Sequence, residues 1–427
     1  MIIKPPISSG SGVSLVQTAE TITFPQSVNK INDLIYKMGV TGQTSAIFES
    51  ASSSYVQVTQ VDTNRYVVAY RDFGNSGYGT ACVLTVNPAD NTVTSYTPVV
   101  FESASTLYVS IAKLDTNKAI VVYQDAGNSS YGTACVLTVN PADNTISAGT
   151  PTVFASVSTL TCVVCQTQTD KVIVAYRDQT NSSYGKAVVL TVSGTTITVG
   201  SILTFESTNS ISNPQIVALN STQAIVSYNS LGLKLRVLGN PSGTILNTGN
   251  SASLANGADA PSPMVALSDS KIFIAYGNYS AYCAILNVYS GNNIISYGNV
   301  PILFNQIATS SLSACLLEAN KIMVAYRDGS NNNYGASLTF NVIGEEIFID
   351  RNKRNFNTSD SGSFTLSPID SSRALVCYSD GGNGSYGTTR VLKLDTCTGY
   401  TLSGQFNSNN VSGHSDNINV VPYVSLT

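Results

Sequence analysis

The sequence predicts an all-β protein built from one repeated unit, and three observations support this fold class. A marker tyrosine recurs along the chain at intervals of 48 to 53 residues. The runs around each marker are rich in β-branched residues and end in clusters of Gly, Asn, Asp and Pro, as strands and tight turns require. Runs with the period and length of a helix are missing from the repeats. The marker tyrosines are Tyr70, Tyr123, Tyr176, Tyr228, Tyr276, Tyr326 and Tyr378.

The second copy shows how four strands fit into one repeat. The expected strands cover residues 108–114, 119–125, 131–139 and 145–154, with polar turns between them. Four antiparallel strands in about 50 residues are typical of a propeller blade. We therefore predict that residues 48–406 form a seven-bladed β-propeller of four-stranded antiparallel blades, one for each marker tyrosine.

Two segments flank the predicted propeller. Residues 1–47 begin with a lead rich in Pro, Ser and Gly, followed by a run, residues 15–24, that is compatible with an extra strand. Val28, Ile31, Leu34, Ile35 and Met38 then stand at helical spacing, which predicts one short amphipathic helix. Because residues 1–47 lie outside the repeat, we expect them to attach the protein to a partner, with a helix that caps the propeller as the alternative. Residues 407–427 form a polar C-terminal tail.

Composition excludes several classes of function. The chain of 427 residues has a net charge of −4 and only 11% charged residues, so no positive excess is present to bind nucleic acid. No apolar run approaches the roughly 20 residues that a membrane-spanning helix needs, and no apolar signal-peptide core follows the start. The one histidine, His414, excludes histidine-based triads and multi-histidine zinc sites. We expect no cofactor, no metal and no membrane insertion.

The eight cysteines are expected to be free thiols inside strands. Cys82, Cys135 and Cys377 lie in alternating apolar runs. Cys162 and Cys165 have the C-x-x-C spacing of redox and zinc motifs, but on a strand residues three apart point to opposite faces. Buried thiols without chemistry are common in proteins.

The pattern Asp-x-x-Asn-x-x-Tyr recurs in five of the seven repeats and has two interpretations. Asp and Asn bond their own backbone in tight turns, so the pattern is typical of a well-formed hairpin loop. A carboxylate, an amide and an aromatic ring can also bind sugar hydroxyls, which makes the loops candidate ligand-binding sites. The loops share one face with the connections between blades at residues 48–52 and 101–105. The fifteen residues are Asp72, Asn75, Tyr78, Asp125, Asn128, Tyr131, Asp178, Asn181, Tyr184, Asp328, Asn331, Tyr334, Asp380, Asn383 and Tyr386.

Further patterns bear on stacking and on catalysis. Each loop tyrosine follows its marker tyrosine by eight residues, which predicts cross-strand aromatic pairs, with sugar stacking as the alternative. Arg71, Arg177 and Arg327 follow the marker in three repeats and distantly echo the arginine cluster and Asp-box hairpin of sialidases. Acidic residues recur in turns instead of standing at unique positions, so no general acid and base pair is identified. We expect no catalytic residue and no enzymatic activity.

The repeat unit around Tyr70 and its copies, VVAYRDxGNSxYGTAxVLTV, resembles repeats in bacteriophage virion proteins of the tail-fibre and head-fibre sort, over about residues 48–406. The repeats around Tyr228 and Tyr276 depart from this unit because they lack the loop. The resemblance implies a non-enzymatic virion structural protein, made in the host cytoplasm and present in several copies. It would dock onto other virion proteins through residues 1–47 and display its propeller to a host-surface glycan. The alternatives are an extracellular lectin or scaffold propeller unconnected with virions, and a sialidase-like glycosidase.

Overall fold

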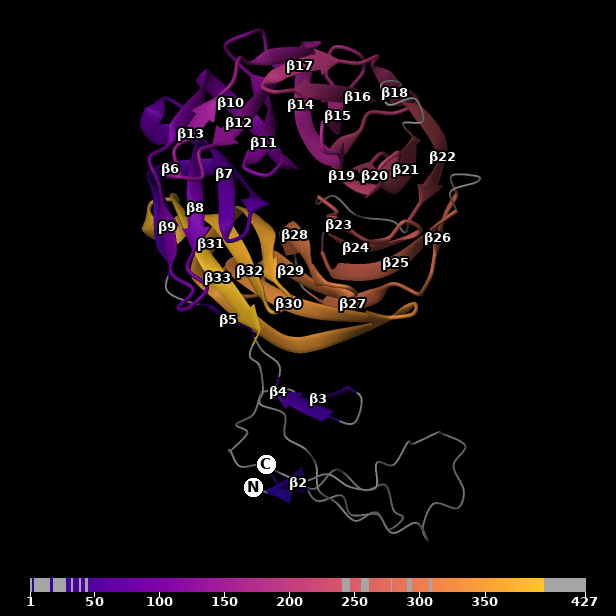
Figure 1. The fold of residues 1–427 in the computed structure, drawn as a ribbon. Helices are drawn as coiled ribbons and strands as arrows, with labels where there is room; N and C mark the ends of the chain where they lie inside the picture. Colours follow the sequence, from indigo (N-terminus) through magenta and orange to yellow (C-terminus); the bar gives the residue numbers. More distant parts are fainter. Residues whose placement is uncertain are drawn as a thin grey trace.

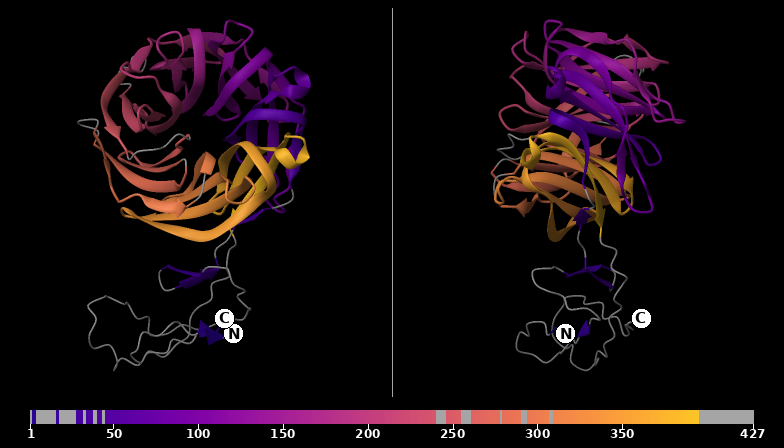
Figure 2. Two further views of the ribbon diagram at one scale, coloured as in Figure 1. Left: turned by 180° about the vertical axis from the view of Figure 1, so that it is seen from behind. Right: turned by 90° about the vertical axis from the view of Figure 1, so that its left-hand side faces the viewer.

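The computed structural model describes residues 45–239, 246–254, 261–277, 279–289, 294–306 and 309–394, together with short strands between residues 2 and 42. In this part of the chain, antiparallel sheets stand side by side in a ring around a central axis (Figure 1). The same ring is seen from behind and from the side in Figure 2. The expected all-β, propeller-like fold is therefore confirmed.

The strands follow one another around the ring in chain order. The first three sheets contain β6 (Ala46–Asp62), β7 (Arg65–Asp72), β8 (Tyr78–Val86), β9 (Val93–Ser95), β10 (Val99–Asp115), β11 (Lys118–Asp125), β12 (Tyr131–Val139), β13 (Ile146–Ala148), β14 (Thr152–Gln168), β15 (Lys171–Asp178), β16 (Tyr184–Ser193), β17 (Thr196–Val199) and β18 (Leu203–Glu206). The next two contain β19 (Ser212–Asn220), β20 (Gln223–Asn229), β21 (Leu233–Gly239), β22 (Asn247–Ser253), β23 (Met264–Ser268), β24 (Lys271–Gly277), β25 (Ala281–Tyr289), β26 (Ile294–Tyr297) and β27 (Ile302–Asn305). The remaining sheets contain β28 (Thr309–Glu318), β29 (Lys321–Asp328), β30 (Tyr334–Ile343), β31 (Glu346–Asp370), β32 (Arg373–Asp380) and β33 (Tyr386–Leu394).

Helical structure is confined to single turns in the described residues. The two 3₁₀ turns are η1 (Phe73–Asn75) and η2 (Gly381–Asn383), each of three residues. Both lie in the loop between the second and third strands of a sheet. In this part of the chain no helix has the length and hydropathy that a membrane crossing needs.

The second repeat shows how closely the strands match the prediction. β12 covers residues 131–139 as expected, and β11 begins one residue earlier than expected. The fourth strand is divided into β13 and the start of β14, and both parts pair with β12. Pro151 stands in the interruption, and proline cannot donate a ladder hydrogen bond.

Long strands join each sheet to the next. Residues 99–105 of β10 pair with β8 at the outer edge of the first sheet, and residues 106–115 pair with β11 as the innermost strand of the second. β6, β14 and β31 are shared between neighbouring sheets in the same way. The innermost strands contact their neighbours around the axis, and β31 contacts β6. The ring is closed by β33, which pairs with β5 (Val40–Gly42) and with the first residues of β6.

A phenylalanine is wedged between neighbouring sheets in each of these long strands. Phe101 packs its ring against Tyr123 of the second sheet, with centroids 5.2 Å apart. On its other side it lies against Gly79 of the first sheet, where a Cβ atom would come within 2.4 Å of the ring. Phe154 makes the same contacts with Tyr176 and Gly132. The Tyr-Gly pair of the repeat therefore keeps its glycine to make room for this ring.

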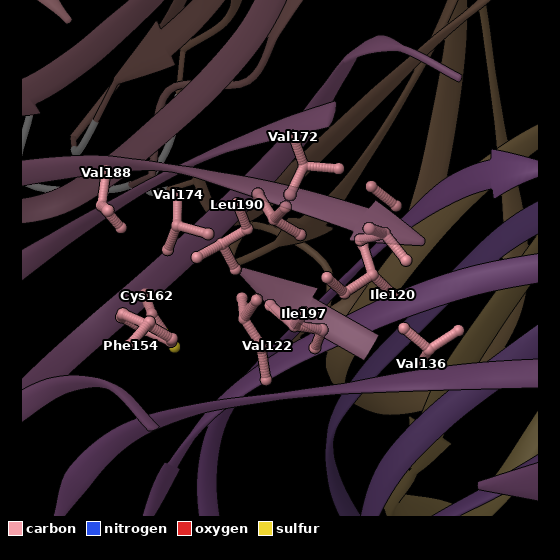
Figure 3. Packing of buried hydrophobic residues seen from close by; sticks show 14 of the residues in the cluster. Ile120, Val122, Val136, Phe154, Cys162, Val172, Val174, Val188, Leu190 and Ile197 are labelled. Carbon is pink, nitrogen blue, oxygen red and sulfur yellow. The ribbon is translucent and has the colours of Figure 1, made fainter. Parts of the chain in front are cut away.

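The hydrophobic core lies between the sheets and not within one of them. The cluster between the second and third sheets joins Ile120 and Val122 of β11, Phe154 and Cys162 of β14, and Val174 of β15 (Figure 3). Burial of each such apolar side chain stabilises the folded protein by roughly 1.5–3 kcal/mol. Equivalent clusters follow around the ring, and one of them joins the last sheet to the first. These interfaces make the face of the ring a rigid platform.

The predicted helix near residues 28–38 is wrong. Residues there form β3 (Val28–Ile31) and β4 (Leu34–Lys37), which pair antiparallel, while β1 (Ile2–Ile3) pairs with β2 (Val16–Gln17). Asn32 and Asp33 stand between β3 and β4, and these residue types favour turns over helix interiors. The tail, residues 407–427, lies outside the described residues.

Candidate functional site

The five predicted loops are built around aspartates that cap their own turns. Asp125 Oδ1 accepts hydrogen bonds from the backbone N–H groups of Gly127, at 2.9 Å, and Asn128, at 3.2 Å. Asp72 Oδ1 accepts one from the N–H of Asn75 at 3.2 Å. Both carboxylates are buried. The turn-forming interpretation of these aspartates is therefore confirmed in geometry.

The other three loops repeat this arrangement with extra partners. Asp178 Oδ1 accepts from the backbone N–H and the hydroxyl of Thr180, at 3.0 and 2.7 Å. Asp328 Oδ2 lies 2.6 Å from Lys353 Nζ. Burial alone would raise the pKa of Asp328, but the hydrogen bonds from Lys353 and Ser330 outweigh it and lower this pKa below its ordinary value.

The last aspartate, Asp380, differs in receiving side-chain donors from the preceding connection. Its Oδ1 accepts from the N–H of Gly382 at 3.1 Å, from the Ser359 hydroxyl at 2.6 Å and from the Asn357 amide at 2.9 Å. The loop and the connection are thus held together on one face of the ring.

The asparagines and tyrosines of the pattern lie beside these capped turns. Asn128, Asn181 and Asn383 are exposed, and Asn75 and Asn331 are half-buried. Each loop tyrosine is half-buried and stands opposite its aspartate in the ladder between the second and third strands. The structure therefore brings the three residues of each loop together, and the accessible amide comes from the asparagine.

The connections between sheets stand on the same face as the loops, as predicted. A Cβ atom at Gly127 would lie 2.4 Å from Cβ of Ala104, and the N–H of Ala126 donates to Ser105 O at 3.0 Å. The loop of the first sheet meets its connection in the same way, with Gly74 against Ala51. Loop and connection therefore form one continuous surface.

The marker tyrosines do not form the predicted cross-strand aromatic pairs. Tyr70 stands opposite Thr80 in the ladder, and its ring packs on Phe48, with centroids 5.2 Å apart. Its hydroxyl donates to Glu49 Oε2 at 3.0 Å. The eight-residue spacing places Tyr78 two ladder positions away from Thr80, so the aromatic partner comes from the preceding sheet. The marker tyrosines are core residues and are not available for sugar stacking.

Buried tyrosine–glutamate pairs recur at the sheet junctions. Tyr123 donates to Glu102 at 3.0 Å and Tyr228 donates to Glu206 at 3.1 Å. Burial raises the pKa of Glu102 despite the hydrogen bond from Tyr123. Burial opposes ionisation of Glu206 too, but hydrogen bonds from Thr208 and the nearby Lys234 ammonium lower its pKa to about 2. The glutamates lie in the connections between sheets, and the sequence alone did not reveal that they accept hydrogen bonds from the marker tyrosines.

The arginines that echo sialidases make local contacts. Arg71 donates from Nη2 to Ser105 Oγ at 2.9 Å and lies over the ring of Phe73, 4.5 Å from its centroid. Arg327 forms a two-point contact with Asp360, at 2.9 and 2.8 Å. Arg71 and Arg327 thus each bind a connection beside their own loop, whereas the buried Nε of Arg177 has no hydrogen-bond partner.

A cavity on the ring axis was not anticipated from the sequence. It has a volume of about 410 Å³ and is lined by the innermost strands β6, β10, β14 and β19. None of the fifteen predicted loop residues lines it. Its polar lining comes from Tyr55, Gln57, Tyr108, Ser110, Thr161, Asn213 and Gln215.

The cavity residues sit on bulges of the innermost strands. Tyr55, Tyr108, Thr161 and Asn213 occupy equivalent positions and have φ angles of 52, 50, 46 and 48°, in the left-handed region that non-glycine residues rarely adopt. The ladder register shifts at each of these positions. The 53-residue spacing of Tyr55 and Tyr108 was visible in the sequence, but the bulge that turns these residues toward the axis was not.

The cysteines behave as expected where they are described. Cys82, Cys135, Cys162, Cys165, Cys283, Cys315 and Cys377 are buried and free, and Cys397 lies outside the described residues. Cys162 and Cys165 belong to different interface clusters, because they point to opposite sides of β14. Burial raises the pKa of each of these two thiols to about 12. In the described residues no group of His, Cys, Asp and Glu side chains is placed to hold a metal ion.

Comparison with known proteins supports the fold. No family model matches the chain, and no curated protein matches it. The periplasmic gluconolactonase of Pseudomonas aeruginosa is 15% identical over 74% of this chain and 94% of its own, with a TM-score of 0.50. A protein of unknown function from Dyadobacter fermentans is 12% identical over 83% of this chain and 99% of its own, with a TM-score of 0.47. For the NanB sialidase of Streptococcus pneumoniae the identity is 12%, the coverage 83% and 70%, and the TM-score 0.46.

The likeness to the gluconolactonase shows the propeller-like all-β architecture alone. At this identity it carries no conclusion about activity or ligand. The role in a virion is not tested by these comparisons and stays a prediction.

Proposed function

We propose that this protein is a non-enzymatic bacteriophage virion protein that displays a seven-bladed β-propeller for recognition of a host-surface glycan, as a component of tail-fibre or head-fibre type. The observation that carries the proposal is the repetition of one loop design on one face of the ring. Five loops present an asparagine amide beside a half-buried tyrosine. Amides donate to and accept from sugar hydroxyls, and aromatic rings can stack on sugar faces.

Repetition compensates for weak single contacts. Each loop offers few groups, and no tryptophan is present in the chain to provide a large stacking surface. Several equivalent sites on a rigid platform can raise avidity by about 10²–10⁴ over one site. A neutral, repetitive glycan is the ligand that suits this arrangement, because the Asp charges are turned inward to the loop backbone.

The proposed number of seven blades is supported by the strand pairings. Successive described sheets begin with the innermost strands β6, β10, β14, β19, β23, β28 and β31, and each carries one marker tyrosine on the next strand. The contact of β31 with β6 agrees with a ring that closes after the seventh unit.

The proposed virion setting is supported by the resemblance of the repeat and by three highly exposed apolar side chains. Leu231, Tyr279 and Val300 are 90, 82 and 83% exposed. They belong to the fourth and fifth units, the repeats around Tyr228 and Tyr276, which lack the loop. These units are suited to face a neighbouring subunit in a multicopy assembly, while residues 1–47 serve as the attachment segment.

The setting is tested by locating the chain in purified phage particles with an antibody and by mass spectrometry. We expect the chain in intact particles, and its loss from particles when residues 1–39 are deleted from an otherwise folded protein. A chain that is absent from particles but binds glycan would instead be a lectin or scaffold propeller. Hydrolysis of a sialoside by the purified chain would contradict the non-enzymatic role.

Recognition is tested with Asn128→Ala and Asn181→Ala, singly and together. Both side chains are exposed, so the folded ring should be retained. We expect a graded loss of adhesion to host cells, because each substitution removes one repeated contact. Thr63→Ala and Thr116→Ala are matched controls, since both residues are exposed on turns at the opposite end of the strands. Equal adhesion by all five variants would reject the loop face as the binding surface.

A further inference from the structure

We propose that the axial cavity is a second binding site, which takes one or two sugar rings of a neutral saccharide. The cavity volume of about 410 Å³ lies within the roughly 300–1,000 Å³ of small-molecule sites. The inference rests on the proposed glycan recognition for its biological use, and it adds one site among the innermost strands to the repeated sites at the loops.

The lining favours a neutral polyhydroxylated ligand. Gln57, Asn213 and Gln215 contribute amides, and Ser110 and Thr161 contribute hydroxyls. Such groups both donate and accept hydrogen bonds, which matches the hydroxyls of a sugar. No Lys, Arg, Asp or Glu belongs to the lining, so the cavity offers no charged partner to a phosphate or an amine.

Two tyrosines supply the aromatic part of the site. The rings of Tyr55 and Tyr108 are in contact, with centroids 5.3 Å apart and planes inclined at 55°. Both are half-buried, so part of each remains accessible from the cavity. With these two rings beside amides and hydroxyls, a sugar ring can stack on a tyrosine and form hydrogen bonds at the same time.

The arrangement is held by bonds between neighbouring innermost strands. The N–H of Tyr55 donates to Ser363 Oγ at 3.2 Å, and Cys162 Sγ donates to Tyr108 O at 3.1 Å. The N–H of Val164 donates to Ser110 Oγ at 3.2 Å. These bonds hold the backbone of Tyr55 and Tyr108 and the hydroxyl of Ser110 in place before a ligand arrives, which lowers the entropic cost of binding.

The side chains at the bulges differ between the two sides of the axis. Ser311 of β28 and Ser363 of β31 occupy the equivalent bulge positions, with φ angles of 50 and 39°, and do not line the cavity. The left-handed backbone therefore occurs in six of the seven repeats, and the four of these residues that are Tyr, Thr or Asn line the cavity. The fifth repeat has Pro261 at the equivalent position. Bulges commonly redirect a side chain next to a functional site.

The position of the cavity links it to the loops. Ser53 and Ser54 pair with Asp72 and Arg71, so Tyr55 lies near the start of the part of β6 that pairs with β7, beside the loop face. A glycan whose terminal ring occupies the cavity can therefore extend across the same face that carries the loops.

The test is direct binding of free sugars to the full chain, with glucose, galactose, mannose, fucose and N-acetylglucosamine as probes, by saturation-transfer NMR and titration calorimetry. We expect one sugar or its disaccharide to bind with unit stoichiometry. Tyr108→Ala should weaken this binding about tenfold or more, and Gln57→Ala should weaken it by a smaller factor. Ser311→Ala is the matched control, because it changes an equivalent bulge outside the cavity, and it should bind like the wild type.

The loop variants separate this inference from the proposed function. Asn128→Ala with Asn181→Ala should lose cell adhesion and keep free-sugar binding, whereas Gln57→Ala should lose free-sugar affinity in a fully folded protein. The inference is overturned if no probe binds the wild type, if Gln57→Ala and Ser311→Ala bind equally, or if the loop variant loses the free sugar. Adhesion that depends on the loops would still support the proposed function in each of these cases.

Discussion

The second and third units can be compared with the fourth, which shares their core but not their surface. Tyr123, Tyr176 and Tyr228 are equally buried, and each packs on a phenylalanine from the preceding connection. The second unit then carries a polar loop capped by Asp125. The fourth unit has Ser230 at the equivalent position, followed by Leu231, which is 90% exposed.

The difference shows that the core of the repeat and its surface loop are separable. The wedge, the marker tyrosine and the interface clusters are present with and without the loop, so the loop is not needed to build a unit. The loop is present in five units and absent from two, so its role lies at the surface of the ring and not in the core. This comparison can be tested by substitutions at equivalent positions.

The largest effect on stability is expected at the phenylalanine that is wedged between neighbouring sheets. Phe154→Ala and Phe205→Ala should each lower the free energy of unfolding by about 3–5 kcal/mol, because both rings are almost completely buried between sheets. Urea unfolding followed by circular dichroism measures both. Phe348→Ala is the control, since Phe348 is 44% exposed and should cost little. A small loss in Phe205→Ala alone would show that the fourth unit has a different core.

The next effect concerns the hydroxyl of the marker tyrosine. Tyr228→Phe should cost about 1.5–3 kcal/mol, because it removes a buried hydrogen bond to the Glu206 carboxylate. Tyr176→Phe should be nearly neutral, because Ala155 stands where the first, second and fourth units have Glu49, Glu102 and Glu206. The same urea experiment compares them, and equal losses in both variants would contradict the role assigned to the glutamate.

A smaller loss is expected at the capped turn. Asp125→Ala should cost about 1 kcal/mol, since two loop N–H groups lose their acceptor. Ser230→Ala, at the equivalent position of the fourth unit, should change the free energy of unfolding very little. Thermal unfolding of the two variants beside the wild type gives the comparison. A larger loss in Ser230→Ala than in Asp125→Ala would remove the proposed division between the two kinds of unit.

The smallest expected effect is a difference in pH dependence between the two glutamates. The pKa of Glu206 is lowered from 4.5 to about 2, so its stabilising contribution is present above about pH 4.5 and is lost as the pH falls toward 2. The pKa of Glu102 is raised, so the contribution of Glu102 to stability depends on pH in the opposite direction. It is present below about pH 4.5 and declines as the pH rises above that value. Unfolding measured against pH should become less acid-sensitive in Glu206→Gln and more acid-sensitive in Glu102→Gln. Parallel profiles for the two variants would contradict this assignment.

Much of the fold could be predicted because the local signals agree with one another. Residues 131–139 alternate between the two faces of a strand and are bounded by turn residues, and the structure places β12 at these positions. Helical spacing alone misled the prediction at residues 28–38. The same apolar positions are compatible with two short strands around Asn32 and Asp33, and no tertiary contact was available to decide between them.

The site could be predicted only in part. Asp72 and its equivalents were recognised from their turn chemistry, which depends on neighbouring residues. The partner of Tyr70 was missed because Phe48 and Glu49 belong to the preceding connection. The axial cavity depends on a φ angle near 50° at Tyr55 and Tyr108 and on four strands from different repeats, and no short-range pattern in the sequence encodes either feature.

The central claim is that the five loops, and not the two units without them, carry recognition. It is tested most directly by binding of the full chain to arrayed host-surface glycans. One variant replaces the five loop asparagines by alanine, and a second carries Leu231→Ser and Tyr279→Ser on the units without loops. The account predicts that the wild type and the second variant bind the same glycan, while the five-loop variant, folded as judged by circular dichroism, does not. Undiminished binding by the five-loop variant, or its loss in the second variant alone, would contradict the account. The five residues are Asn75, Asn128, Asn181, Asn331 and Asn383.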